Sequence, residues 1–387
     1  LVIETGILGT LLALDLVLFF VFFEVVLLPM YAVIAGWGGK QRRHAARKFA
    51  LYTLFGSVLL LVGVFTVVAA GDTADIVALT GGDGLSRGAQ LAAFTLFALA
   101  FAVKSPLWPL HTWLPAAHTQ APTVGSVILA GVLLKMGTYG LIRIGVGVTP
   151  EGARWAAPVI GVLAVAAIIV GALVCLAQDE LKRLIAYSSV GHMGFVLLGV
   201  ATLTATGIQA ALIGNIAHGI ITGLLFFLAG AIKDRAGTGS LTALQGLRET
   251  APRLAGLLAF AAVASLGLPG LAGFWGEAFA VAAALQVGGA LWTTLGVLAA
   301  IGGALTAAYF LRMLFRVTHG PASPAVARIG AQPSAGRTQG SARSSGPAAL
   351  PAGRLAAAEL GAWGPLALLA LAVGLMPALV LGIAAEP

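Results

Sequence analysis

Four ionisable residues lie deep inside long apolar stretches of this sequence: Glu24, Lys104, Lys135 and Glu277. At 1.5 Å per helical residue, the lysines lie about 20 Å into their apolar runs and Glu24 lies about 15 Å into its own. A charge at the centre of a bilayer costs on the order of 3 kcal/mol or more. These residues indicate either static ion pairs that fix helix packing or, as we favour, a path for protons or ions.

The two lysines suit proton transfer better than metal-ion binding. Burial disfavours the charged form of an amine and a neighbouring carboxylate favours it, so movement of the carboxylate would load or release a proton. Glu24 is the only carboxylate in the first half of the chain that lies deep enough to partner Lys104. We therefore expect Glu24 and Lys104 to act as a coupled pair.

Two histidines, His192 and His218, also lie inside apolar segments. Each could be a hydrogen-bonded packing residue. A neutral imidazole also passes protons readily, because one ring nitrogen accepts while the other donates. We therefore expect both to belong to the same proton path as the four charged groups.

The composition requires a membrane around these residues. Of 387 residues, 59% are hydrophobic and 9% are charged, and the mean hydropathy is +1.00. Ordinary soluble domains contain about 25% charged residues. Lipid cannot satisfy backbone polar groups, so the apolar runs must be helices, and the alternation typical of a transmembrane barrel is absent. The sequence predicts an all-α integral membrane protein.

Charge and cysteine content exclude other classes. The net charge is +8, but the basic residues lie in loops between apolar runs, so membrane topology explains them and nucleic acid is not an expected partner. The one cysteine, Cys175, lies within an apolar run and can form no disulfide within the chain. No cysteine set for an iron–sulfur cluster or for zinc exists.

About eleven transmembrane helices are expected from the apolar runs. Pro269 and Gly270 fall inside one run that is too long for a single straight span, so a broken helix is expected there. The runs are 1–13, 14–36, 50–70, 89–114, 122–144, 155–177, 184–203, 207–231, 254–286, 290–311 and 362–384.

The helices divide into two repeats of five, at about 1–144 and 155–311. Each repeat has a charged residue beside a helix-breaking sequence in its fourth helix, namely Lys104 in the first and Glu277 in the second. Corresponding interrupted helices in two halves are typical of inverted repeats with a site at the membrane midplane. We expect one half-channel in each repeat, within a translocation domain over 1–317.

Two segments follow this domain. Residues 318–356 are rich in Ala, Gly, Ser, Pro and Arg, which predicts a flexible cytoplasmic linker. Residues 357–387 contain the last apolar run and are expected to form a C-terminal transmembrane helix.

The loops predict the orientation in the membrane. One set of alternate loops carries seventeen Lys and Arg residues and the opposite set carries three. Positively charged loops stay in the cytoplasm, so we expect a multi-pass protein of the inner (plasma) membrane with its C-terminus on the outer face.

Four long motifs stand out in the sequence: FFVFFEVVLLPMYAVIAGWGG at 19–39, FAVKSPLWPLHTWLPAAHTQAPTVGSVILAGVLLKMGTYGLIR at 101–143, LKRLIAYSSVGHMGFVLLG at 181–199 and NIAHGIITGLLFFLAG at 215–230. They resemble the antiporter-like membrane subunits of respiratory complex I, the NADH–quinone oxidoreductase. The resemblance covers nearly the whole chain except the linker.

The resemblance implies roles for matching residues. Glu24 and Lys104 match the carboxylate–lysine pair of the first half-channel, and Lys135 matches the central relay lysine. Glu277 matches the terminal group of the exit path. The bridging histidines of the family match His192 and His218.

One position narrows the resemblance further. The motif LGLPGLAGFWGEAF at 266–279 carries Glu277 where sister subunits and the related cation/proton antiporter subunits typically carry Lys. The chain therefore resembles the subunit group called M, or chain 4. A subunit of a multisubunit sodium/proton antiporter and a pump subunit of a membrane-bound hydrogenase are the alternatives.

The implied function is proton translocation in the membrane arm, as one subunit of the enzyme. The sequence has no Gly-rich nucleotide-binding turn and no Cys cluster. No cofactor is expected in this chain, because NADH, FMN, the iron–sulfur clusters and quinone would bind partner subunits. Its partners would be other membrane-arm subunits, including antiporter-like neighbours, with the lipid bilayer around them.

The chain departs from the family in two respects. Ala116 and Gln120 stand where the family usually has Asp and often has Glu, which puts proton uptake through that loop in doubt while leaving the core path intact. Full family members have fourteen helices, and this sequence opens with Leu1 inside an apolar run, so about three helices are expected to be missing at the N-terminus.

Overall fold

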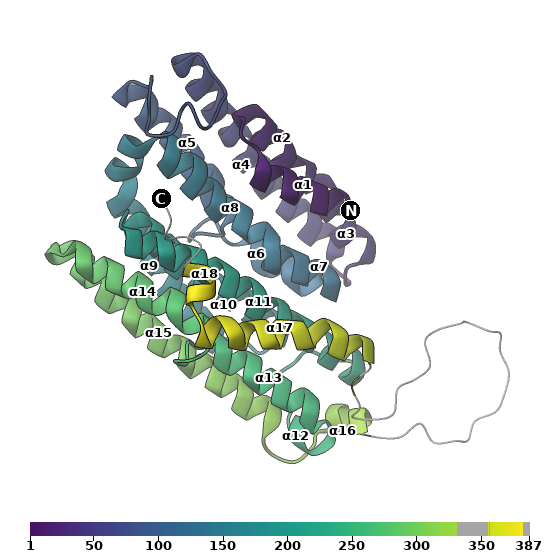
Figure 1. Cartoon of the computed structure of the whole chain (residues 1–387). Helices are drawn as coiled ribbons and strands as arrows, with labels where there is room; N and C mark the ends of the chain where they lie inside the picture. The colour runs from purple at the N-terminus through teal and green to yellow at the C-terminus, as the bar shows by residue number, and fades with distance from the viewer. Residues whose placement is uncertain (331–354, 356, 382–387) are drawn as a thin grey trace.

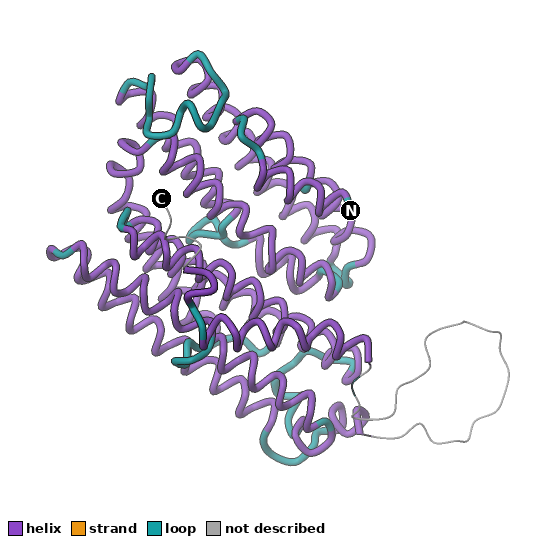
Figure 2. The backbone as a smooth tube through the Cα atoms, in the orientation of Figure 1, coloured by secondary structure: helices purple, strands orange, loops and turns teal. Residues whose placement is uncertain are grey.

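The computed structural model of the protein describes residues 1–330, 355 and 357–381, and all regular structure in these ranges is helical (Figures 1 and 2). The helices up to residue 146 lie along one side of the molecule (Figure 1). They are α1 (Val2–Leu12), α2 (Leu16–Val25), α3 (Leu27–Trp37), α4 (Arg42–Gly71), α5 (Arg87–Lys104), α6 (Trp113–Gln120), α7 (Thr123–Ile128), the π-helical segment η1 (Leu129–Leu133), α8 (Leu134–Gly140) and the π-helical segment η2 (Leu141–Val146).

The later helices form the other side of the bundle, and α17 lies across them (Figure 1). They are α9 (Pro150–Leu176), α10 (Leu181–Ala201), α11 (Ala205–Ala236), α12 (Leu247–Thr250), α13 (Pro252–Ser265), α14 (Ala272–Val287), α15 (Gly289–Thr318), α16 (Pro324–Gly330), α17 (Ala357–Leu375) and α18 (Ala378–Leu381).

The helices confirm the expected membrane architecture. Nine segments of the described residues are long and apolar enough to cross a bilayer, and three shorter apolar helices are α1, α13 and α14. Helices α13 and α14 have 14 and 16 residues, too few to span about 30 Å of hydrocarbon alone. If α13 and α14 are counted as one broken span and α1 as a short span, the nine candidate spans become the expected eleven.

Large apolar side chains cover the outside of these helices. Leu51 is 67% exposed, Phe65 is 59% exposed and Val159 is 61% exposed, all on candidate spans. Such a surface fits hydrocarbon, whereas water would penalise it. Helix α10 is the central element, since 18 of its 21 residues are buried. A residue at the middle of α10 is therefore shielded from lipid on every side.

The break at Pro269 and Gly270 is present where the sequence predicted it. Helix α13 ends at Ser265 and α14 begins at Ala272. Between them Gly267 and Gly270 have φ angles of +79° and +90°, which are strained for any residue with a Cβ atom. The break therefore turns the chain between α13 and α14, with Leu268 exposed, and leaves backbone groups there outside the helical ladder.

A pair of backbone contacts occurs twice along the chain. Asp15 forms an antiparallel bridge with Asp75, and Glu180 forms one with Ser240. Each bridge closes 60 residues, and the second lies 165 residues after the first at both ends (180 − 15 and 240 − 75). Two hydrogen bonds of 2.8–2.9 Å make each bridge. We call these pairs the Asp15–Asp75 clasp and the Glu180–Ser240 clasp.

The two clasps lie at opposite ends of the bundle. The loop that follows the first clasp is bonded through the Gly81 amide to Gly147, next to the start of α9. The second clasp directly follows the end of α9, a helix of 27 residues or about 40 Å. The same backbone contact thus recurs at the opposite end of the bundle. Two inverted repeats, at about 1–144 and 155–311, would produce such a pattern.

The expected linker over 318–356 is only partly described, since 331–354 and 356 lie outside the described residues. The preceding residues pack on the bundle. Val326 on α16 is fully buried, and the Ser323 hydroxyl donates to the Ala243 carbonyl. The low apolar content of the segment did not predict this packing.

Helix α17 is attached to the second half of the chain. Trp275 Nε1 on α14 donates to the Gly374 carbonyl on α17 at 2.8 Å, and Arg235 Nη2 on α11 donates to both carboxylate oxygens of Glu359 at 2.8 Å. A Cβ atom on Gly374 would lie 2.4 Å from the Gly270 carbonyl oxygen. The last helix is therefore in direct contact with the break between α13 and α14.

Candidate functional site

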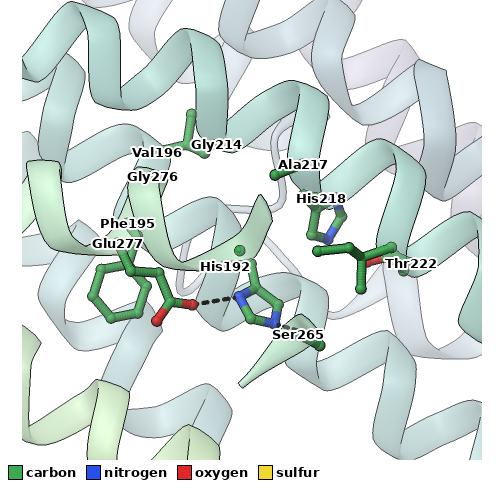
Figure 3. A pocket seen from close by; sticks show the side chains of 12 residues that line it. His192, Phe195, Val196, Gly214, Ala217, His218, Thr222, Ser265, Gly276 and Glu277 are labelled. Carbon is green, nitrogen blue, oxygen red and sulfur yellow. Dashed lines mark hydrogen bonds and ion pairs between the residues drawn. The ribbon is translucent and has the colours of Figure 1, made fainter. Parts of the chain in front are cut away.

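His192 and Glu277 are joined at the centre of the second half. His192 lies midway along α10, and Glu277 lies on α14, one and a half turns after the break. His192 Nδ1 is 2.9 Å from Glu277 Oε1, and their side chains are only 10% and 14% exposed (Figure 3). The break allows this contact, because a Cβ atom on Gly267 would lie 3.0 Å from Glu277 Oε2.

The other nitrogen of the His192 ring is bonded to Ser265, the last residue of α13. Its Oγ is 3.0 Å from His192 Nε2 (Figure 3), and its side chain is 2% exposed. Both nitrogens of His192 therefore have partners, and these partners come from the two sides of the broken helix.

A small cavity is lined by both His192 and His218, the latter on α11. Their ring centroids are 5.7 Å apart, and the lining includes Ser265, Thr222 and Glu277 (Figure 3). The free volume open to the centre of a water molecule is about 20 Å³. One water molecule needs about 10–15 Å³ by that measure, so the cavity has room for one.

Lys135 is joined to His218 across the two halves of the chain. Lys135 Nζ on α8 is 2.6 Å from His218 Nδ1, and it also donates to the Ala130 carbonyl. Next to this contact, the Thr138 hydroxyl donates to Asn215 Oδ1 at 2.9 Å and ties α8 to α11. The helix that carries Lys135 is flanked by the π-helical segments η1 and η2. Such segments occur frequently at functional sites.

Glu24 and Lys104 lie in the first half without forming an ion pair. Ser57 on α4 donates to Glu24 Oε1 at 2.5 Å, and Lys104 Nζ lies over the Phe23 ring, 4.6 Å from its centroid. The two charges are near enough to interact electrostatically. Lys104 is 5% exposed. Its Cβ atom packs against Gly137, which lies two residues after Lys135.

The six residues selected from the sequence thus form two groups. Lys135, His218, His192 and Glu277 make one nearly continuous series, interrupted only by the cavity between the histidines. The second group consists of Glu24 and Lys104. It lies beside the first, because Lys104 packs against Gly137 on α8, the helix that carries Lys135. All members of the series are protonatable, so the arrangement can transfer protons along its length.

The sequence reasoning missed the hydroxyl residues of this site. The Ser57 hydroxyl bonds to Glu24, and the Ser265 hydroxyl bonds to His192. Thr222 lines the cavity. A serine in a helix usually bonds a carbonyl of its own helix, so its presence in an apolar run carried no signal. Position was the available clue for Ser265, because it lies two residues before the first glycine of the break.

Gln120, one of the two departures, has a structural role. Its Oε1 accepts from the Gln41 backbone amide at 2.9 Å, and its carbonyl accepts from Gly39 at 2.7 Å. The side chain fastens the loop between α3 and α4. A glutamate at this position could accept the same hydrogen bond from the Gln41 amide. Glutamine therefore keeps the contact but carries no charge.

Within the described residues, no group of three or more His, Cys, Asp or Glu is placed to hold a metal ion.

Comparisons with known proteins show the family of the chain. A sequence model of the family "NADH:quinone oxidoreductase/Mrp antiporter, TM" matches residues 13–302. NADH-quinone oxidoreductase subunit M of Rhodobacter capsulatus is 43% identical over 332 residues, which are 83% of this chain and 64% of that relative. The chain thus spans less than two thirds of the length of this curated relative.

Solved structures match over almost the whole chain. A chain of respiratory complex I from Thermus thermophilus with bound NADH is 32% identical, with a TM-score of 0.84, covering 98% of this chain and 75% of that one. A chain of the Mrp complex from Dietzia sp. DQ12-45-1b is 27% identical, with a TM-score of 0.83, covering 98% and 74%. This chain therefore belongs to the family of transmembrane subunits shared by NADH:quinone oxidoreductases and Mrp antiporters.

Proposed function

We propose that this chain conducts protons across the membrane as a membrane-arm subunit of an NADH–quinone oxidoreductase. The observation that carries the proposal is the series of protonatable groups Lys135, His218, His192 and Glu277, which meet at 2.6 Å and 2.9 Å on either side of a cavity. Static ion pairing would leave the two histidines without a purpose, because a lysine and a glutamate pair best in direct contact.

Each group has a distinct task in this proposal. Lys104 and Glu24 take up and hold a proton in the first half, where the Ser57 hydroxyl supports the carboxylate. Lys135 passes a proton to His218, and His192 passes one to Glu277. Glu277 then releases it toward the outer side, because the break at Pro269 leaves free backbone groups that can hold water beside the carboxylate.

The redox chemistry belongs to partner subunits in this proposal. NADH, FMN, the iron–sulfur clusters and quinone would bind those subunits, while this chain contributes no redox centre and acts as part of the enzyme they complete. The support is the identity of the Rhodobacter relative as a subunit of an NADH-quinone oxidoreductase, together with the absence of cysteine sets, since Cys175 is the one cysteine of the chain. Neighbouring antiporter-like subunits would pack on its lipid-exposed faces.

The orientation follows the positive charges. With seventeen basic residues in one set of loops, those loops face the cytoplasm of a cell whose plasma membrane holds the complex. The described end of α17 then lies toward the outer face.

A role in an Mrp-type sodium/proton antiporter is the second candidate. The 27% identity with the Dietzia Mrp chain favours it. The carboxyl group of Glu277 argues against it, because the resemblance assigns a lysine to this position in those subunits.

The test is Glu277→Gln, which keeps the shape and hydrogen bonding of the side chain but cannot ionise. We expect the complex to assemble and to reduce quinone while proton uptake falls by about tenfold or more, in line with loss of one acid–base group. Uptake is measured in inverted membrane vesicles and normalised to assembled complex. Glu4→Gln, at an exposed position, is the control. Uptake at the parental rate in Glu277→Gln would make the carboxylate structural.

A further inference from the structure

His192 has no free nitrogen with which to receive a proton. A carboxylate only accepts hydrogen bonds, so Glu277 requires a hydrogen on His192 Nδ1, 2.9 Å away. In the neutral ring Nε2 is then an acceptor, and the Ser265 hydroxyl donates to it at 3.0 Å. Any proton that arrives from the cavity must pass Ser265 or displace it.

His218 presents the opposite arrangement. A lysine ammonium only donates, so Lys135 gives a hydrogen bond to Nδ1 and leaves the hydrogen of the neutral His218 ring on Nε2. His218 Nε2 is buried and has no hydrogen-bond partner within the described residues, and the same is true of Thr222 Oγ1. Both side chains are at most 5% exposed and both line the cavity.

These polar atoms define a binding place for one water molecule. Buried polar groups without protein partners usually bond to ordered water, which makes about three hydrogen bonds. The cavity is large enough for one molecule, and His218, Thr222 and Ser265 supply three partners around it (Figure 3). This water molecule would link His218 to Ser265. The remaining link, from Ser265 to His192, runs through the Ser265 hydroxyl.

We infer that Ser265 is a further residue of the proton path and carries the proton from the cavity to His192. This inference rests on the proposed function. Lys135 gives a proton to His218 Nδ1, and His218 gives its Nε2 proton to the water. The water passes one of its own protons to Ser265 Oγ while the Ser265 hydroxyl proton goes to His192 Nε2. His192 then gives its Nδ1 proton to Glu277.

The sequence of steps balances. The water and Ser265 each end with the number of protons they began with, and each histidine has exchanged one tautomer for the other. The net result is the transfer of one proton from Lys135 to Glu277. A further transfer requires both histidines to return to their starting tautomers by a second proton exchange on each ring.

The test uses Ser265→Thr and Ser265→Val, which have the same shape and differ by the hydroxyl group, together with Ser265→Ala. They are compared in the intact complex in inverted vesicles, with proton uptake divided by the rate of quinone reduction. We expect Thr to retain uptake near the parental level, and Val and Ala to reduce it by about tenfold or more. Ser189→Ala is the control, because that buried hydroxyl on α10 donates to the Ile185 carbonyl of its own helix.

Two results would overturn the inference. Uptake in Ser265→Val equal to that in Ser265→Thr would show that the hydroxyl is not needed, and so would parental uptake in Ser265→Ala. Glu277→Gln is measured beside them to separate the two proposals. Loss of uptake in Glu277→Gln with normal uptake in Ser265→Val defeats this inference alone, whereas normal uptake in Glu277→Gln defeats the proposed function.

Discussion

Lys135 Nζ lies 2.6 Å from His218 Nδ1, and the two residues belong to different halves of the chain, 83 positions apart. This contact joins the half that contains Glu24 and Lys104 to the half that contains Glu277. Any relative movement of α8 and α11 changes it directly, since each helix supplies one partner.

Lys135→Met should abolish proton transfer between the halves. Methionine retains most of the length of the side chain but has no proton to give, so His218 loses its donor. We expect proton uptake to fall by about tenfold or more with the complex assembled. Lys40→Met, at an exposed loop position, is the control and should behave like the parent. Parental uptake in Lys135→Met would mean that protons cross the bundle by another route.

Ser57→Ala should impair the first half through Glu24. The hydroxyl of Ser57 donates to the carboxylate, and its removal leaves a partly buried acceptor without that bond, at a cost of about 1–3 kcal/mol. We expect a lower thermal unfolding temperature and slower proton uptake. Thr53→Val is a matched control on α4, since the Thr53 hydroxyl donates only to carbonyls of its own helix. Equal effects of the two substitutions would contradict a special role for Ser57.

Gly374→Ala should loosen α17 and disturb the break beside it. The added Cβ atom would lie 2.4 Å from both the Gly270 carbonyl oxygen and Leu271 Cα, and such overpacking costs about 1–3 kcal/mol. We expect lower thermal stability and reduced proton uptake, because Glu277 follows this break. Gly361→Ala is the control on the same helix, where a Cβ atom meets nothing within 4 Å. Identical melting curves for the two variants would show that α17 does not support the break.

The sequence predicted the helices and the buried charges because both depend on local composition. Apolar runs locate the spans, and Pro269 with Gly270 locates the break, since each acts on its own backbone. The proximity of His192 to Glu277 depends instead on how α10 packs against α14, 85 residues away in the chain. The family resemblance could suggest that these residues act together, but only the fold gives the contact.

The expected pairing of Glu24 with Lys104 shows the same limit. Sequence reasoning placed a carboxylate and an amine at similar depth, which is necessary for an ion pair but does not fix the rotamers. In the folded chain Ser57 bonds to the carboxylate and the Phe23 ring faces the amine. A cation over an aromatic ring is stabilised by about 2 kcal/mol when desolvated, so the lysine has an alternative to direct pairing.

The two clasps bear on how the protein is made. Each one closes a hairpin of two candidate membrane spans with four backbone groups, from Asp15 to Asp75 and from Glu180 to Ser240, and neither needs a residue from the other half. The first hairpin can therefore close while the ribosome is still translating the second, as expected for units that fold in order of synthesis. Because the clasps lie at opposite ends of the bundle, the two hairpins close at opposite ends of it. We therefore expect the two halves of the chain to close as separate units, in the order in which they are synthesised.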